Sequence, residues 1–332
     1  MALNMYLMSI CIPTYNGQET LRETLDSLIV ERKDHQVEII INDDKSTDET
    51  FIIAKEYAEK FPFISIYQNK ENLRMDRNFT ATAVKAQGKY VWLCGQDDIL
   101  QRGAIDKAIE IIKEHDEVNF IYFNYKFVDD TLQYEVMPPK LSIQNDMYFE
   151  DHINYFQKIK LAPTFLPATI MKKHFWDNPV YEDYFDTYYV QVGVWLEHSK
   201  NADVFVVADP NYVLCRVPAE SWKYKDGQML YETEIGKLRV YRTALNHAKI
   251  DQSVFNYIKK LYLKSAFLNI LASKSKGLNI TLKNLNDIQF VFHGSKHEYA
   301  YAIAIVSIPS WLAKPLYFFG QGLRKVYRSI NG

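Results

Sequence analysis

Short apolar runs alternate with amphipathic stretches over the first 130 residues of the chain. The apolar runs predict strands at residues 7–15, 37–41, 63–68 and 89–95. The stretches that follow them carry apolar residues at helical spacing and predict helices at residues 19–30, 48–60, 76–87 and 102–114. Strands that alternate with helices of this length form βαβ units, so the sequence predicts an α/β fold with a mostly parallel sheet.

The pattern loosens after residue 130. Helices are expected at residues 149–160 and 187–198, the second begun by Asp186, and strands at residues 165–171, 204–208 and 212–216. From residue 227 onward the pattern is helical and increasingly basic. We therefore expect three regions, residues 1–130, 131–226 and 227–332, with no low-complexity linker between them.

Charge is distributed unevenly along the chain. The 39 Lys/Arg and 41 Asp/Glu give a net charge of −2, which does not favour nucleic acid as a partner. Residues 237–332, however, hold 15 Lys/Arg and three Asp/Glu, a net charge of +12. An acidic body with a basic end favours a C-terminal region that faces an anionic partner. Three widely spaced cysteines and an N-terminus without a basic leader favour a cytoplasmic protein.

Polar clusters follow three of the expected strands, at residues 14–16, 42–44 and 96–98. Ligands bind beyond the carboxyl ends of parallel strands, so these clusters are expected to converge on one crevice. Asp97 and Asp98 offer the hard oxygen ligands that Mg²⁺ or Mn²⁺ prefers, and a diphosphate substrate would bring such a cation. The alternative for this pair is a solvated acidic turn that caps the next helix.

The three clusters, in this order and at these spacings, resemble the motifs of glycosyltransferase family 2 on a GT-A fold. They read Ile-Pro-Thr-Tyr-Asn at residues 12–16, Asp-Asp-Lys-Ser-Thr-Asp-Glu-Thr at 43–50 and Gln-Asp-Asp at 96–98. The resemblance covers residues 7–105, includes Asn72 and Asn78, and is closest to bacterial O-antigen sugar transferases of the abequosyltransferase type. Arg74 stands where such relatives often carry Gly, and Gln96 takes the first position of their DxD motif.

The resemblance implies a role for each matching residue. Thr14 and Tyr15 would flank a nucleotide base, and Asp43 would bind the edge of that base. Asp97 would contact the ribose, and Asp98 would hold Mn²⁺ or Mg²⁺ between the two phosphates. The nucleotide-sugar site expected in this way consists of Pro13, Thr14, Tyr15, Asp43, Asp44, Arg74, Asn78, Asp97 and Arg216.

Arg216 enters this set through its chemistry, because a guanidinium can bind a phosphate with two hydrogen bonds. The alternative for Arg216 is a surface ion pair with Glu220 or Asp226. An inverting transferase also needs a base for the acceptor hydroxyl, which many members of the family take from a Glu-Asp pair at a helix start. We choose Asp186, with Asp183 second, although Gln191 lies nearer the usual position and Asp186 could serve only as a helix cap.

The resemblance implies an inverting, metal-dependent glycosyltransferase that uses a nucleoside diphosphate sugar and a glycan acceptor, expected to be lipid-linked. In this interpretation residues 1–130 bind the nucleotide sugar and residues 131–226 bind the acceptor. A nucleotidyltransferase is disfavoured because no Gly-rich loop follows the first strand. A non-catalytic nucleotide-sugar-binding protein remains an alternative, because no Glu-Asp pair matches the family position cleanly.

The C-terminal residues favour attachment to a membrane surface. Residues 299–319 are largely apolar, but Pro309 and Pro315 argue against a straight spanning helix. Aromatic residues followed by Arg324, Lys325 and Arg328 are typical of an interfacial segment on an anionic leaflet. The alternative is a core helix that packs on the catalytic domain or on a second subunit of a homo-oligomer.

Overall fold

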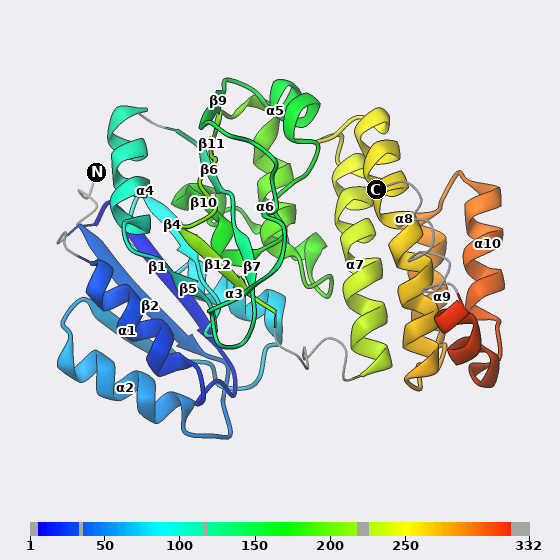
Figure 1. Cartoon of the computed structure of the whole chain (residues 1–332), viewed down its shortest axis with the longest axis horizontal. Coiled ribbons are helices and arrows are strands. Elements are labelled where there is room, and N and C mark those ends of the chain that lie inside the picture. Colours follow the sequence, from blue (N-terminus) through cyan, green and yellow to red (C-terminus); the bar gives the residue numbers. More distant parts are fainter. Residues whose placement is uncertain (1–5, 33–35, 116–117, 218–225, 320–332) are drawn as a thin grey trace. The chain divides into compact units, whose positions relative to one another are not determined.

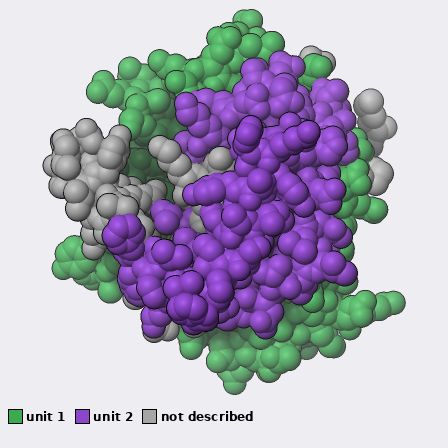
Figure 2. Space-filling model, turned by 90° about the vertical axis from the view of Figure 1, so that its right-hand side faces the viewer, with its two compact units in different colours: residues 1–185, 190–219 green, residues 186–189, 220–332 purple. Residues whose placement is uncertain are grey.

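The computed structural model describes residues 6–32, 36–115, 118–217 and 226–319 (Figure 1). The chain divides into two compact units, drawn in different colours in Figure 2. The first unit consists of residues 1–185 and 190–219, and the second of residues 186–189 and 220–332. The sequence placed its last boundary at residue 227, whereas the second unit also includes the short stretch 186–189. The division of labour expected for residues 1–130 and 131–226 stays a prediction.

The first unit is built on an eight-stranded sheet in the order β3-β2-β1-β4-β10-β6-β11-β9. Its strands are β1 (Met8–Thr14), β2 (Val37–Asp43), β3 (Ile64–Gln68), β4 (Tyr90–Leu93), β6 (Phe120–Phe123), β9 (Met147–Phe149), β10 (Thr169–Lys172) and β11 (Val204–Val207). The strands β3, β2, β1 and β4 are parallel to one another, as the alternating pattern predicted. The strand β10 then runs antiparallel to both β4 and β6.

Strands β1 and β2 are buried at every position, which is typical of strands covered on both faces by helices. The connecting helices are α1 (Leu21–Glu31), α2 (Thr50–Lys60), α3 (Met75–Ala83) and α4 (Ala104–Glu114). Each lies where a helix was predicted, but α3 ends four residues before the expected Gln87. A loop made by residues 84–89 then leads into β4.

A smaller, four-stranded sheet has the order β5-β12-β7-β8. Its strands are β5 (Ile99–Leu100), β7 (Lys126–Val128), β8 (Glu135–Met137) and β12 (Val213–Arg216). The strand β5 directly follows the turn that carries Asp97 and Asp98, and it pairs antiparallel with β12. This pairing therefore joins the β4 end to a strand more than 100 residues further along the chain.

The region after residue 130 departs from the sequence prediction at three places. The strand expected at residues 165–171 begins instead as a 3-10 turn, η1 (Leu166–Ala168), before β10. The helix expected at residues 149–160 is α5 (His152–Ile159), preceded by β9 and capped by the Asp151 side chain. The helix expected at residues 187–198 is α6 (Val190–His198), so Asp186 does not begin it. Short 3-10 turns, η2 (Lys173–Phe175), η3 (Pro179–Tyr184) and η4 (Ser199–Asn201), complete this region.

The second unit is helical, as predicted from residue 227 onward. It contains α7 (Gly227–Asn246), α8 (Gln252–Ser275), α9 (Leu282–Val291) and α10 (Lys296–Val306). Their buried faces form one apolar cluster that includes Tyr231, Leu238, Ile270, Ile288 and Ile305. Among the described residues no single helix is long and apolar enough to cross a membrane, although Lys296–Val306 and Ser310–Phe319 pass that test as a pair bent by 113°. Arg324, Lys325 and Arg328 lie outside the described residues.

Candidate nucleotide-sugar site

The three predicted motifs meet at one edge of the large sheet. Strand β1 lies between β2 and β4, and all three run in the same direction. Thr14 at the end of β1 is level with Asp43 at the end of β2, and Cys11 is level with Leu93 near the end of β4. The parallel arrangement therefore brings residues 13–16, 43–50 and 95–98 together, as the sequence predicted.

The turn after β4 is bound to the loop after β1 through Gln96. Its side-chain Nε2 donates to the Tyr15 carbonyl at 3.1 Å, and its Oε1 accepts from the Tyr15 backbone N–H at 2.9 Å. The Thr24 hydroxyl of α1 donates to the Gln96 backbone carbonyl at 2.8 Å. Gln96 was noted in the sequence only as a departure from the DxD motif; the structure shows that its amide joins two of the three motif loops.

Asp98 is buried in this turn, and only one of its carboxylate oxygens is occupied by the protein. Oδ2 accepts from the Gly95 backbone N–H at 2.7 Å, and no hydrogen bond from a described residue reaches Oδ1. A Cβ at position 95 would lie 2.5 Å from the Asp98 Oδ2, so any larger residue there would displace the Asp98 carboxylate. Burial and the neighbouring charge of Asp97 raise the pKa of Asp98 well above its ordinary value, against the opposing effects of the Gly95 N–H and the Arg216 charge.

Arg216 lies close to these carboxylates because of the strand pairing. Leu214 of β12 is level with Ile99 of β5, and continuing this antiparallel register places Arg216 opposite Asp97. Its positive charge opposes the rise that burial causes in the pKa of Asp98. The structure thus places Arg216 near Asp97 and Asp98, and its role in binding phosphate stays a prediction.

The ion pair of Arg216 differs from the alternatives considered in the sequence. Its NH2 donates to the Glu23 carboxylate of α1 at 2.7 Å, and its NH1 donates to the Asp130 carbonyl at 3.3 Å. The expected partner Asp226 lies in the second unit, and Glu220 lies outside the described residues. The Arg216 Nε is buried and makes no hydrogen bond with the described residues.

Asp43 differs from Asp98, because the protein occupies both of its oxygens. Oδ1 accepts from the Ser46 hydroxyl at 2.5 Å and from the Thr14 hydroxyl at 3.4 Å. Oδ2 accepts from the Ser46 N–H at 3.1 Å and from the Gln68 amide at 2.9 Å. A carboxylate offers about four acceptor positions, so Asp43 is saturated with hydrogen bonds. Binding to a nucleotide base, as the sequence predicts, would replace the long Thr14 bond.

Asp44 and Asn78 accept hydrogen bonds from the loops at this edge of the sheet. Asp44 is buried, and its Oδ1 accepts from the Asn69 amide at 2.7 Å and from the Leu73 N–H at 2.8 Å. Burial raises the pKa of Asp44, although these two donors oppose the shift. Asn78 accepts from the Asn42 and Asn69 amides at 2.7 and 3.0 Å. Both residues therefore shape the loops here, and their contact with a nucleotide sugar stays a prediction.

Arg74 adopts a backbone conformation that ordinarily requires glycine. Its φ is 67° and its ψ is 170°, a region that is essentially reserved for Gly. The conformation is fixed on its N-terminal side, where the Asn72 side chain accepts from the Arg74 N–H at 2.9 Å and Asp44 holds Leu73. Glycine would adopt this conformation without strain. The Arg74 side chain is exposed just before α3, at the edge where the motifs meet.

The two candidate bases lie in different units. Asp183 is exposed in η3 of the first unit. Asp186 is exposed in the second unit, has a positive φ of 60°, and its backbone carbonyl accepts from Arg239 at 3.0 Å. Asp186 is not the cap of α6; the Val190 N–H at the start of α6 instead donates to Asp76 of α3 at 3.1 Å. The role of Asp76 at the start of α6 was not predicted, because Asp76 and Val190 lie 114 residues apart in the sequence. Gln191, in α6, donates to the Thr164 carbonyl.

A divalent cation fits the β4 end, the turn after β4 that carries Asp97 and Asp98, if a bound substrate supplies further ligands to the cation. No group of three or more His, Cys, Asp or Glu among the described residues is arranged to hold a metal ion. Asp98, however, is a buried carboxylate with a free oxygen and a second carboxylate beside it, and the repulsion between them would be relieved by a cation. The residues therefore fit a cation that is held partly by the protein and partly by a phosphate-bearing ligand.

Comparisons with known proteins agree with this geometry. The model of glycosyl transferase family 2 matches residues 9–176. Abequosyltransferase RfbV of Salmonella typhimurium is 28% identical over 293 residues, which cover 83% of each chain. The structure of S. aureus TarS 1–349 in complex with UDP-GlcNAc is similar with a TM-score of 0.63 at 17% identity, covering 96% of this chain and 91% of that chain. Mannosyltransferase PcManGT from Pyrobaculum calidifontis, in complex with GDP-Man and Mn²⁺, has a TM-score of 0.53 at 13% identity, covering 98% and 89%.

These similarities define the class of protein. The mostly parallel sheet with strand-end motifs is the GT-A fold of glycosyltransferases, which confirms the fold predicted from the sequence. The family model matches half of the chain, and the chain belongs to glycosyltransferase family 2. It is a glycosyltransferase, and this favours transfer over the nucleotidyltransferase and non-catalytic alternatives.

Proposed function

We propose that the chain transfers a sugar from a nucleoside diphosphate sugar to a glycan acceptor with inversion at the anomeric carbon. The observation that supports this most strongly is the β4 end, where Asp98, Asp97 and Arg216 lie together. Two carboxylates and a guanidinium suit a ligand that combines a cation with phosphate. The similar solved structures hold UDP-GlcNAc or GDP-Man, which are ligands of this kind.

In this proposal, the loops after β1 and β2 bind the nucleoside. Tyr15 is 44% exposed beside buried Pro13 and Thr14, so its ring is available to pack on a base. Asp43 binds the edge of the base, held in place by Ser46 and Gln68. The same bonds that saturate its carboxylate fix its position before the donor arrives.

The β4 end binds the ribose and diphosphate. Asp97 is exposed and accepts hydrogen bonds from the ribose hydroxyls, whereas Asp98 contributes an oxygen to a bound Mn²⁺ or Mg²⁺. When bound, the cation stabilises the negative charge that develops on the leaving diphosphate. The unpartnered Nε of Arg216 and the exposed side chain of Arg74 add positive charge for the phosphates.

A carboxylate from the acceptor side removes the proton of the attacking hydroxyl. We assign this role to Asp186, with Asp183 as the second choice. The Asp186 backbone is held in a sparsely populated conformation, and such residues cluster at functional sites. The neutral amide of Gln191 cannot act as a base, although it lies nearer the position of the family pair.

We further propose that the acceptor is lipid-linked, that it serves surface polysaccharide synthesis, and that the second unit attaches to the inner, anionic face of the cell membrane. Trp311, Phe318 and Phe319 of the helix Ser310–Phe319 are 75%, 61% and 67% exposed, whereas Ala313 is buried. Exposed aromatic residues beside Lys314 suit the interface of a bilayer. The alternative, in which this face packs on a second copy of the chain, would show as a stable dimer in solution.

The membrane proposal is tested with vesicles that contain anionic phospholipid. The double variant Trp311→Ser/Phe318→Ser should lose vesicle binding, while Tyr134→Ser, equally exposed in the first unit, should not. Retained binding by the double variant, or no binding by the wild-type chain at low salt, would overturn it.

The proposed reaction is tested by measuring nucleoside diphosphate release from a panel of donors with Mn²⁺ present. Release from one nucleoside diphosphate sugar, faster when a glycan acceptor is added, supports the proposal. Release of pyrophosphate from a nucleoside triphosphate and a sugar phosphate would instead show a nucleotidyltransferase. Binding of a nucleotide sugar without any turnover would show a non-catalytic binding protein.

A further inference from the structure

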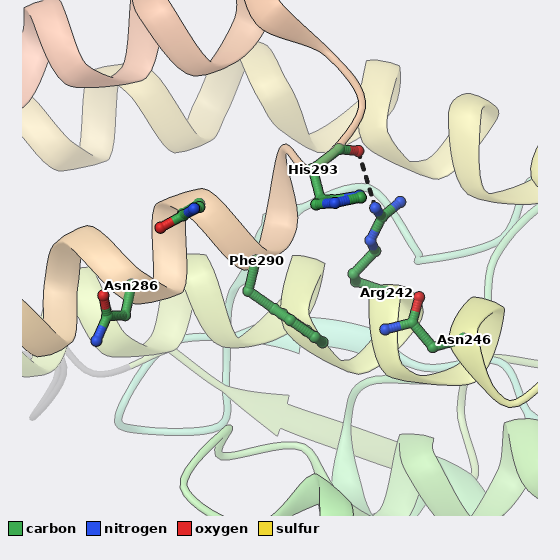
Figure 3. Close-up of a pocket in the computed structure, with 6 residues that line it drawn as sticks. Arg242, Asn246, Asn286, Phe290 and His293 are labelled. Carbon is green, nitrogen blue, oxygen red and sulfur yellow. Dashed lines mark hydrogen bonds between the residues drawn. The ribbon is translucent and has the colours of Figure 1, made fainter.

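A cavity in the second unit carries an unpaired positive charge. It has a volume of about 390 Å³, which lies in the range of small-molecule sites. Two of its lining residues come from α7, three from α9, and one from the turn after α9: Arg242, Asn246, Asn286, Gln289, Phe290 and His293 (Figure 3). All six lie within one unit.

The charge belongs to Arg242, which is only 8% exposed. Its NH2 donates to the His293 backbone carbonyl at 2.8 Å, the dashed line in Figure 3, and its guanidinium lies 5.3 Å from the centre of the Phe255 ring. No carboxylate among the described residues forms an ion pair with Arg242; Asp287, which follows the lining residue Asn286 in the sequence, pairs with Arg239. A guanidinium has five N–H donors, so most of them face the cavity or solvent without a protein acceptor.

A buried cation without an anionic partner is unfavourable, because desolvation is not offset by an ion pair. Burial lowers the pKa of Arg242, and no neighbouring carboxylate raises it. Elsewhere in this unit Lys237 pairs with Glu234 and Lys259 pairs with Glu298, whereas buried Lys274, like Arg242, donates only to a backbone carbonyl, that of Val306. Arg242 differs from Lys274 in lining a cavity, where a ligand would supply the anionic partner that Arg242 lacks.

The rest of the lining suits a sugar. The amides of Asn246, Asn286 and Gln289 make no hydrogen bonds with other described residues, so they offer both donors and acceptors to hydroxyl groups. Figure 3 shows Phe290 on α9 with its ring directed toward the α7 side that carries Arg242 and Asn246. Its ring is 37% exposed and gives an apolar wall for the C–H face of a sugar ring.

We infer that this cavity, which we call the Arg242 pocket, binds a phosphorylated sugar, with the phosphate on Arg242 and the sugar hydroxyls on the amides. We take this sugar phosphate to be part of the acceptor. In that one respect the inference rests on the proposed function. If the acceptor carries phosphate, the Arg242 pocket would bind the phosphorylated sugar of the acceptor and not the hydroxyl that attacks the donor.

The test measures binding to the full chain by calorimetry, with glucose 6-phosphate, glucose and inorganic phosphate as probes. We expect glucose 6-phosphate to bind at least about tenfold more tightly than either glucose or phosphate. Arg242→Met, which keeps the packing on Phe255, should weaken that binding about tenfold or more. The control Lys283→Met removes the same charge from α9 at an exposed residue outside the lining and should leave binding unchanged.

A second variant avoids any effect on folding. Asn246 is exposed, and Asn246→Asp places a carboxylate beside Arg242, which should reduce glucose 6-phosphate binding as strongly as Arg242→Met does. The inference is wrong if the wild-type chain does not bind glucose 6-phosphate, if both variants bind it like the wild type, or if phosphate alone binds equally well. Vesicles that bind through Arg242 but are not displaced by glucose 6-phosphate would show a lipid headgroup site instead. Donor turnover by the wild-type chain tests the proposed function separately.

Discussion

The ends of β2 and β4 each present an aspartate at the same edge of the sheet, yet the protein treats the two carboxylates differently. Asp43 accepts four hydrogen bonds from its surroundings. Asp98 accepts one, beside the charged Asp97. The hydrogen bonds of Asp43 hold its carboxylate in one position, whereas burial raises the pKa of Asp98 and one of its oxygens has no hydrogen bond from a described residue. The difference teaches that adjacent acidic motifs can divide their roles, one to position a loop and the other to bind a cation and its ligand.

The largest expected effect comes from Asp98→Asn. Turnover should fall on the order of 10³-fold or more, because the cation loses its buried anionic ligand. Stability at neutral pH should be unchanged or higher: the pKa of Asp98 is raised in the fold, so its ionisation lowers stability above the unfolded-state pKa. Initial rates and urea unfolding measure the two effects. Near-normal turnover by Asp98→Asn would show that Asp98 does not bind a cation needed for the reaction.

The matched change Asp43→Asn should lower stability, unlike Asp98→Asn, and should also weaken the binding of the nucleotide base. An amide replaces an acceptor-only group that holds Ser46 and Gln68, so we expect a loss of about 2–3 kcal/mol in the free energy of unfolding. Urea unfolding of the two asparagine variants in parallel measures the contrast. If Asp43→Asn is as stable as the wild type, the hydrogen bonds of Asp43 do not have the positioning role that we give them.

The proposed base gives the next effect. Asp186→Asn keeps the backbone carbonyl that Arg239 binds, so the fold should be preserved while kcat falls about 10²–10⁴-fold. Asp183→Asn, in η3, is the control and should have a small effect on kcat. A reversed result would move the role to Asp183, and a lower melting temperature with normal kcat would show that Asp186 is structural.

Arg216 should affect the binding of the donor. Arg216→Met should raise the donor KM about tenfold to 100-fold, because a charged donor to the phosphates is lost. Glu23→Gln removes only a half-exposed ion pair and should change KM by less than about fivefold. If both variants raise KM equally, the ion pair with Glu23 is itself the feature that matters.

The smallest effect is expected at Arg74. Arg74→Gly should relieve about 1–3 kcal/mol of backbone strain and lose somewhat less in chain entropy, for a net gain of about 1 kcal/mol in stability. Arg74→Ala keeps the backbone strain and removes the charge, so it separates the effect of the backbone conformation from the effect of the side chain. Donor affinity should fall modestly in both variants, as titration of the nucleotide sugar would show. Equal stability of Gly and Ala at this position would show that the backbone is unstrained.

The sequence was sufficient for the sheet and the motifs, because both depend on local patterns. The buried runs of β1 and β2 and the helical spacing between them are visible in single segments, and strand ends converge by topology alone. The second half was predicted less well: the start of α6 depends on Asp76, and the 3-10 turn before β10 has no clear pattern. The partner of Arg216 was also missed, because Glu23 lies 193 residues away in sequence. Such contacts follow from the folded arrangement and leave no local signal.

The central claim is that the β4 end binds the donor diphosphate together with a divalent cation. Calorimetric titration of a nucleoside diphosphate into the wild-type chain and Asp98→Asn, each with and without Mn²⁺, tests it most directly. We predict that Mn²⁺ tightens binding at least about tenfold in the wild-type chain and has no effect in Asp98→Asn. Equal tightening by Mn²⁺ in both proteins would contradict the claim.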